Sequence, residues 1–301
     1  MDLVVIVTGS GGPAGVSVIR ELQRLGHRTI GVDASPDAVG IHLADHGATI
    51  PLSTDASLSD ALNRVADDYG ATTLISTIPD EMMTLKRLEM PHWFPSVDAL
   101  IACTDKWAFY QAMKWAGEMV PDTVLDIDKV DIPRPWIIKP RLGSGSRGIR
   151  RTNNRLLLYP LTHDGDIVQT EITGREFTAD CLIGHGGELI VCVPRWRLET
   201  RGGISTRGET FVDDEVVKTC HGVLNAVGLT GVANVQGFVT DIGVMTIEVN
   251  PRFSGGLPLS LHAGADIVGQ YLNGIHGLPM ETQSYKSHTK MARFFDEVFY
   301  V

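Results

Sequence analysis

The sequence predicts an α/β unit built on a parallel sheet, followed by a strand-rich α+β part. As far as Thr104, short apolar runs alternate with helical periodicity, which is the pattern of a parallel sheet covered by helices. After the proline-rich stretch 132–140, strand patterns dominate. The chain has 301 residues, of which 43% are hydrophobic and 21% charged, and this composition is typical of a globular protein with ample core.

In the α/β unit, strands and helices alternate in chain order. Strands are expected at 4–7, 29–32, 48–50 and 73–76, where the apolar runs are short. The first helix is indicated by four apolar residues that recur at helical spacing: Val16, Ile19, Leu22 and Leu25. Another helix is expected at 57–69, because Gly70 is a typical stop residue behind a helical pattern.

The second part begins with a helix at 105–116 and then turns to strands. These strands are expected at 136–139, 167–170, 177–182, 188–193, 232–240, 244–249 and 291–298. Helical patterns interrupt them at 213–227 and 266–274. The change of pattern indicates a domain boundary near residue 104.

Charge and composition exclude several classes of partner. The net charge is −10 and the pI is about 5.4, so the chain lacks the basic footprint of a nucleic-acid-binding protein. No apolar run approaches the ~20 residues that span a membrane, and the first residues lack the basic segment of a secretory signal. The four cysteines show no Cys-x-x-Cys spacing, which favours buried free thiols. We therefore expect a cytoplasmic protein without nucleic-acid or membrane partners.

A glycine-rich turn after the first strand supports one interpretation, an NAD(P)-dependent short-chain dehydrogenase. Gly9, Gly11 and Ala14 fit G-x-G-x-x-A, and Asp33 stands where a ribose-binding acid is expected. A Tyr-x-x-x-Lys pattern, used by those enzymes for proton transfer, occurs at 110–114. Each signal is weak, because any tight strand-to-helix turn needs glycine. The interpretation also leaves the strand-rich second part without a role.

A lysine followed by a glycine–serine loop is a more specific signal for phosphate binding. Lys139 ends an apolar strand and places a positive charge there. Small residues follow it, and their backbone N–H groups can turn inward around an anion: Gly143, Ser144, Gly145 and Ser146. The structural alternative is a hairpin tip that binds nothing.

The stretch 231–256 predicts a β-hairpin. The turn signal at 241–243 reads as a three-residue loop that pairs Thr240 with Val244. Continuing down the ladder, Gln236 then stands opposite Glu248, with their Cβ atoms ~5 Å apart.

This hairpin carries a candidate metal site. Alternation places Glu248 and Asn250 on one face, and Ile247 on the other. With Gln236 from the partner strand, three oxygen donors meet, and oxygen is the ligand atom that Mg²⁺ prefers. Arg252 follows with a guanidinium that matches a phosphoryl group. A purely structural buried polar cluster is the alternative.

Taken in order, these segments resemble the ATP-grasp superfamily, and the carbamoyl-phosphate-synthase-like members most. The likeness covers essentially the whole chain and is carried by TDK (104–106), IIKPRLGSGSRGI (137–149), VQTEITGREFTADC (168–181), VQGF (235–238), IEVNPR (247–252) and ARFFDEVFYV (292–301). It implies a Rossmann-like domain at 1–103. It further implies a small ATP-grasp subdomain with a glycine-rich lid at 104–171, and a C-terminal subdomain with the metal and γ-phosphate site at 172–301.

The resemblance also implies which residues hold the nucleotide. ATP would be bound by Lys106, Lys139, Gly143, Ser144, Gly145, Ser146, Glu171, Ile172 and Glu176. Within this set the backbone at Glu171 and Ile172 would pair with adenine, and Glu176 would bind the ribose hydroxyls. Mg²⁺ or Mn²⁺ would be held by Gln236, Glu248 and Asn250. The N-terminal glycine turn then becomes a relic of the fold or a substrate-side element.

The implied activity is ADP-forming ligation of a carboxylate to an amine or ammonia through an acyl phosphate. The candidate catalytic residues are Lys139, Arg201 and Arg252, with Arg201 expected to hold the substrate carboxylate or the acyl phosphate. The partners would be small-molecule carboxylates and amines, and a homodimer is compatible with the resemblance. A non-catalytic ATP-binding regulatory module is the further alternative.

Overall fold

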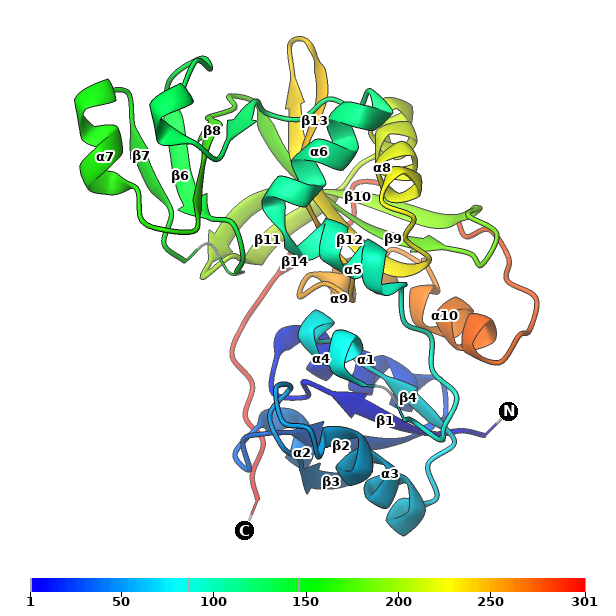
Figure 1. The fold of residues 1–301 in the computed structure, drawn as a ribbon. Helices are drawn as coiled ribbons and strands as arrows, with labels where there is room; N and C mark the ends of the chain where they lie inside the picture. The colour runs from blue at the N-terminus through cyan, green and yellow to red at the C-terminus, as the bar shows by residue number, and fades with distance from the viewer. Residues whose placement is uncertain (1, 86, 144, 146, 301) are drawn as a thin grey trace.

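The computed structural model describes residues 2–85, 87–143, 145 and 147–300. Within them the chain forms three β-sheets, which Figure 1 shows as a lower N-terminal unit and two upper sheets of different size. The α/β and α+β order expected from the sequence is confirmed at this level. None of the helices in the described residues is both long enough and apolar enough to cross a membrane.

The N-terminal unit is a parallel four-stranded sheet in the order β3-β2-β1-β4. Its strands are β1 (Val4–Thr8), β2 (Arg28–Asp33), β3 (His46–Thr49) and β4 (Thr73–Ile75). The helices beside them are α1 (Pro13–Arg24), α2 (Val39–Leu43), α3 (Leu58–Tyr69) and α4 (Pro79–Thr84). As expected, α3 ends at Gly70, which adopts a φ of 67°.

Strand β1 is buried on both faces, which is why its sequence is continuously apolar. Val4 and Ile6 pack toward α3. Val5 and Val7 pack toward α1 and into a core that also contains Leu182. Through that core the N-terminal unit is joined to the second part of the chain.

The largest sheet is six-stranded, in the order β13-β12-β9-β10-β11-β14. Its strands are β9 (Arg175–Ile183), β10 (Leu189–Arg201), β11 (Ile204–Thr210), β12 (Gly231–Thr240), β13 (Gly243–Asn250) and β14 (Lys290–Ala292). The surrounding helices are α5 (Val97–Thr104), α6 (Lys106–Ala116), α8 (Asp214–Ala226), α9 (Leu257–His262) and α10 (Ile267–Ile275). Helices α5, α6 and α8 share one apolar core with this sheet.

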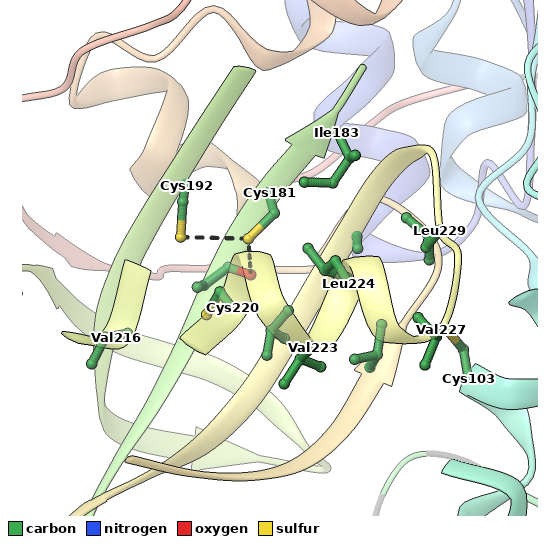
Figure 2. Close-up of a cluster of buried hydrophobic side chains, with 14 of the residues drawn as sticks. Cys103, Cys181, Ile183, Cys192, Val216, Cys220, Val223, Leu224, Val227 and Leu229 are labelled. Atoms are coloured by element: carbon green, nitrogen blue, oxygen red, sulfur yellow. Dashed lines mark hydrogen bonds between the residues drawn. The ribbon is translucent and has the colours of Figure 1, made fainter. Parts of the chain in front are cut away.

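Cysteines form part of that core (Figure 2). Cys181 on β9 and Cys192 on β10 are directly opposed, with their Sγ atoms 3.5 Å apart, and Cys220 on α8 lies beside them. Cys103 on α5 packs elsewhere in the same core. All four cysteines are free and buried, which confirms the expectation of buried thiols.

The smallest sheet is antiparallel, in the order β5-β8-β6-β7, with its own apolar cluster around Trp136 and Ile138. Its strands are β5 (Thr123–Val124), β6 (Trp136–Pro140), β7 (Arg150–Thr152) and β8 (Asp166–Thr170). Short helical segments accompany it: η1 (Ile127–Lys129), η2 (Arg155–Leu157) and α7 (Leu158–Leu161).

Two expected strand limits were wrong. The strand expected at 188–193 continues to Arg201 and pairs with β11, so the two strands form a hairpin. The terminal strand expected at 291–298 ends at Ala292. There the Arg293 side chain donates to the carbonyls of Ser205 and Gly255, and the chain leaves the sheet. It then runs along the N-terminal unit, where Arg20 pairs with Asp296 (Figure 1).

The hairpin β12–β13 differs from expectation in its turn and in one side-chain direction. Thr240 pairs with Gly243, so the loop has two residues, and the register then shifts between Gln236 and Gly237. The shift restores the expected pairing of Gln236 with Glu248 and leaves Ile247 as the extra residue of a bulge. Ile247 therefore lines the same cavity as Glu248, instead of pointing away from it.

Candidate active site

A cavity of about 210 Å³ lies between the smallest and the largest sheet. It is lined by predicted nucleotide and metal residues from both sheets and from the start of α6: Lys106, Lys139, Gly143, Gly145, Glu171, Ile172, Glu176, Gln236 and Glu248. A neighbouring cleft of about 550 Å³ is lined by Asn250 and Arg252 and shares Lys106, Gly143 and Glu248 with the cavity. Ser144 and Ser146 lie outside the described residues.

Two lysines bring positive charge into the cavity. Lys139, on β6, is only 7% exposed, and burial lowers its pKa to about 8, against the opposing effect of Glu248. Lys106 begins α6, and its Nζ donates to the Gly143 carbonyl at 2.8 Å. Burial lowers the pKa of Lys106 as well, again opposed by Glu248. A polyphosphate would replace the water that both ammonium groups have lost.

Lys106 is held in place by the cap of its own helix. The Asp105 carboxylate accepts from the Trp107 N–H at 2.9 Å, which satisfies a free donor at the helix start. The same carboxylate accepts from Arg141 Nε at 2.7 Å. The first turn of α6 is thereby fixed to the segment that follows Lys139.

The segment after β8 offers a free backbone donor and acceptor. The Glu171 N–H donates to the Pro135 carbonyl at 2.8 Å, and the Glu171 side chain accepts from Arg151. Among the described residues, neither the Glu171 carbonyl nor the Ile172 N–H takes part in a loop or side-chain hydrogen bond. Such a pair of groups matches the donor and acceptor edge of a purine.

Arg197 is a site residue that the sequence analysis missed. It lies on β10, is largely buried, and donates to Glu176 Oε1 at 2.6 Å and to Gln236 Oε1 at 2.7 Å. It thus connects the expected ribose acid with an expected metal ligand. The available signal was the alternation of Arg195 and Arg197 in an acidic protein.

The oxygen donors of the hairpin are of the type that binds Mg²⁺ in proteins. Gln236 and Glu248 are directly opposed, and Asn250 donates to Glu248 Oε1 at 3.2 Å. Among the described residues Glu248 forms no ion pair, although it lies close enough to Lys106 and Lys139 to affect the pKa of both. The amide oxygens of Gln236 and Asn250 accept from Arg197 and Arg252. A carboxylate without an ion pair, flanked by two amides, is a donor set that suits a hard divalent ion such as Mg²⁺.

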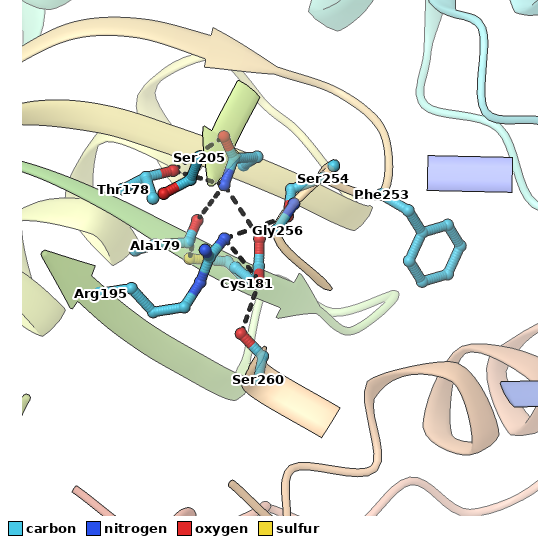
Figure 3. A network of polar contacts seen from close by, with 12 residues as sticks. Thr178, Ala179, Cys181, Arg195, Ser205, Phe253, Ser254, Gly256 and Ser260 are labelled. Atoms are coloured by element: carbon cyan, nitrogen blue, oxygen red, sulfur yellow. Dashed lines mark hydrogen bonds and ion pairs between the residues drawn. The ribbon is translucent and has the colours of Figure 1, made fainter. Parts of the chain in front are cut away.

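A polar network around Arg195 (Figure 3) is connected to this donor set through Gln236. Arg195 is 1% exposed, forms an ion pair with Asp180 at 2.9 Å and donates to Ser254 at 3.1 Å. Asn234 donates to the same Asp180 carboxylate at 2.9 Å and accepts from the Gln236 amide at 3.2 Å. Because these contacts are buried up to Asn234, the network holds Gln236 and the loop behind β13 in one geometry.

The arginines on and behind the β10–β11 hairpin differ in exposure. Arg252 is half-buried, burial lowers its pKa, and its guanidinium donates to the Phe253 carbonyl and to Asn250. With Arg195 and Arg197 it lines a small cavity of about 70 Å³. Arg201, by contrast, lies at the tip of the β10–β11 hairpin, 76% exposed, with Nε 3.6 Å from Glu199. The structure does not bring Arg201 together with the other predicted site residues.

The N-terminal glycine turn is occupied by contacts within the N-terminal unit. The Gly11 N–H donates to Asp33 Oδ2 at 2.9 Å, and Asp33 also accepts from the Ser35 N–H. A Cβ on Gly15 would lie 2.4 Å from the Gly9 carbonyl oxygen, so close packing of α1 on the turn requires this glycine.

Comparisons with known proteins agree with this geometry. Residues 103–256 match the family described as ATP-grasp domain. The carbamoyl phosphate synthase arginine-specific large chain of Geobacillus stearothermophilus is 22% identical over 265 residues, which cover 79% of this chain and 25% of that protein. This chain therefore spans about a quarter of the length of that curated relative.

Solved structures show the same fold. Biotin carboxylase from Campylobacter jejuni aligns with a TM-score of 0.77 and 20% identity, over 96% of this chain and 74% of that one. L-amino acid ligase from Bacillus licheniformis aligns with a TM-score of 0.74 and 16% identity, over 93% and 75%. The family match takes in the lysines of the cavity and the hairpin with its oxygen donors, and this chain belongs to the ATP-grasp family.

Proposed function

We propose that this chain is an ADP-forming ligase that activates a carboxylate as an acyl phosphate and joins it to an amine or ammonia. The observation that carries the proposal is the cavity in which Lys106 and Lys139 lie near Glu248, with Gln236 opposite that carboxylate. One buried and one half-buried lysine beside a carboxylate without an ion pair suit a triphosphate that arrives with its own divalent metal.

The nucleotide would lie between the smallest and the largest sheet. The free Glu171 carbonyl and Ile172 N–H would pair with adenine, and Glu176 would accept from the ribose hydroxyls after exchanging its contact with Arg197. The glycine-rich segment 143–148 would cover the phosphates as a lid. The chain would divide into a Rossmann-like domain at 1–103, a small ATP-grasp subdomain at 104–171 and a C-terminal subdomain at 172–301. The strand order β3-β2-β1-β4 supports a Rossmann-like fold for the first domain.

Phosphoryl transfer needs positioning and charge neutralisation more than covalent catalysis. Lys106 and Lys139 would neutralise the phosphates, and Arg252 would orient the substrate carboxylate or the acyl phosphate. Gln236, Glu248 and Asn250 would hold Mg²⁺ or Mn²⁺, which when bound supplies further charge neutralisation on the transferred phosphoryl group. The small cavity that Arg252 lines together with Arg197 and Arg195 would bring the substrate carboxylate near two further guanidinium groups.

The test is the substitution Glu248→Gln, which keeps the shape of the side chain and removes the carboxylate from the proposed metal site. ADP release from MgATP with pools of carboxylates and amines should fall by at least ~10²-fold, because a charged metal ligand is lost. Glu89→Gln, at an exposed position in the N-terminal unit, is the matched control and should keep full activity. Activity near the original level in the Glu248 variant would reject this residue as a metal ligand.

A further inference from the structure

The cleft beside the nucleotide cavity has a second wall that the proposed function leaves unused. This wall comes from the N-terminal unit, at the carboxyl end of β4, and consists of Thr77, Ile78, Pro79, Asp80 and Met83. The carboxyl ends of parallel strands are where open α/β sheets bind ligands. The cleft of about 550 Å³ thus lies between the N-terminal unit and the segment around Arg252.

The charges of the cleft are few. Its ionisable carboxylate and cationic side chains are Asp80, Lys106, Glu248 and Arg252. Lys106 and Glu248 also line the nucleotide cavity. What remains for a second substrate is one carboxylate, Asp80, on one wall and one guanidinium, Arg252, on the other. Among the described residues, the exposed Asp80 carboxylate forms no ion pair.

Beside the polar residues Thr77, Thr104 and Asn250, the rest of the lining is largely apolar. Leu142, Ile78, Met83 and Val249 contribute side chains, and Pro79 and Pro251 contribute rigid backbone. A single water-sized particle needs only ~10–15 Å³ by this measure of volume. The cleft therefore has room for a molecule much larger than ammonia, with an apolar body.

Asp80 is held in place by a buried neighbour. Glu81 is 3% exposed and accepts from the Thr8 and Ser76 hydroxyls at the ends of β1 and β4. Thr77 donates to the Thr8 carbonyl at 2.9 Å. These contacts fix the first turn of α4 on the sheet, so the side chain of Asp80 starts from a rigid backbone.

We infer that the cleft binds the nucleophile as a primary amine on an apolar body, with its ammonium group paired to Asp80. This inference rests on the proposed ligase function and narrows its second substrate from amines or ammonia to apolar amines. In the reaction the ammonium loses one proton to water, and the nitrogen lone pair attacks the acyl phosphate carbon. The C–O bond to phosphate breaks, phosphate leaves with the electron pair, and the nitrogen loses a second proton to give the amide.

Binding is the first measurement, because it does not require turnover. Calorimetry on the full chain in the presence of MgADP would use leucinamide and n-hexylamine as probes. Hexan-1-ol is the control that lacks the charge, and ammonium chloride is the control that lacks the apolar part. We expect the two amines to bind, and hexan-1-ol, which cannot form the charge-assisted contact, to bind at least about tenfold more weakly. Ammonium should also bind at least about tenfold more weakly, because it has no apolar part to bury. Equal binding of hexan-1-ol and n-hexylamine, or no binding of either amine, would overturn the inference.

Substitution of Asp80 is the second measurement. Asp80→Asn should weaken amine binding about tenfold or more, while MgADP binding stays unchanged. Asp80→Glu should restore part of the loss, and Asp60→Asn, at an exposed position on α3, is the matched control. Unchanged amine affinity in Asp80→Asn would overturn the inference.

Turnover separates this inference from the proposed function. The product with a pool of small carboxylates should be an amide of the added amine, and Asp80→Asn should raise the KM for that amine with the KM for ATP retained. ADP release that ammonium supports as well as the amines do would reject the inference and leave the ligase proposal standing. Amine binding without ADP release from any pair would reject the ligase proposal alone.

Discussion

Lys139 is the residue whose protonation links the proposed nucleotide site to pH. Its pKa is lowered to about 8 by burial, so the ammonium form predominates at neutral pH and is lost as pH rises through 8. A bound polyphosphate favours the ammonium form, so above pH 8 binding must take up a proton. MgATP affinity is therefore expected to be full below pH 8 and to fall about tenfold per pH unit above it.

Calorimetric Kd values for MgATP at pH 7, 8 and 9 would measure this slope. Lys139→Arg is the control, because a guanidinium stays charged throughout this range and its slope should be nearly flat. If the original protein binds MgATP equally well at pH 7 and 9, Lys139 does not contact the phosphates.

At the scale of single elements, the bulge in β12–β13 determines which side chains meet at the candidate metal site. Gly237 lies at the register shift, and a Cβ there would lie 2.3 Å from the Met245 carbonyl oxygen and 2.8 Å from the Phe177 ring. We expect Gly237→Ala to lower the free energy of unfolding by about 1–3 kcal/mol, as overpacking does. Urea unfolding would measure it.

Gly255→Ala is the matched control for that substitution. A Cβ at Gly255 would meet its nearest neighbours, Ile204 and Pro13, at 3.5 Å, which is an ordinary contact. Its unfolding midpoint should therefore stay close to that of the original protein. Equal midpoints for the two variants would mean that the backbone at Gly237 yields without cost.

At the scale of the whole molecule, the Tm measured with each nucleotide should show which one binds and stabilises the folded protein. The proposed ATP site joins two sheets, whereas the glycine turn is closed by contacts with Asp33. We expect MgATP at a hundredfold excess over its Kd to stabilise the folded protein by about 2.7 kcal/mol and to raise Tm accordingly. NAD(P)H should leave Tm unchanged. A Tm rise with NAD(P)H and none with MgATP, in a thermal-shift experiment, would overturn the assignment of the nucleotide.

Local patterns in the sequence predicted most elements and part of the site. Apolar runs, helical spacing and stop residues such as Gly70 are short-range signals, and the strands and helices that they predicted are present. The pairing of Gln236 with Glu248 was also predicted, although the turn was one residue too long. In the structure the turn is one residue shorter, and the bulge at Ile247 restores the pairing of Gln236 with Glu248. Ile247 itself lines the cavity.

By itself, the sequence determined the order of the elements, the free thiols and the residue types that meet on the β12–β13 hairpin, because each depends on neighbours in the chain. Only the tertiary structure decided which arginines face inward. Arg195 and Arg197 are buried by Asp180 and Glu176 from the adjacent strand β9, while Arg201 extends beyond it into solvent. It also placed Asp80 and Arg252 in the lining of one cleft. Contacts between strands and units far apart in the chain set these positions, and periodicity along one strand carries no information about them.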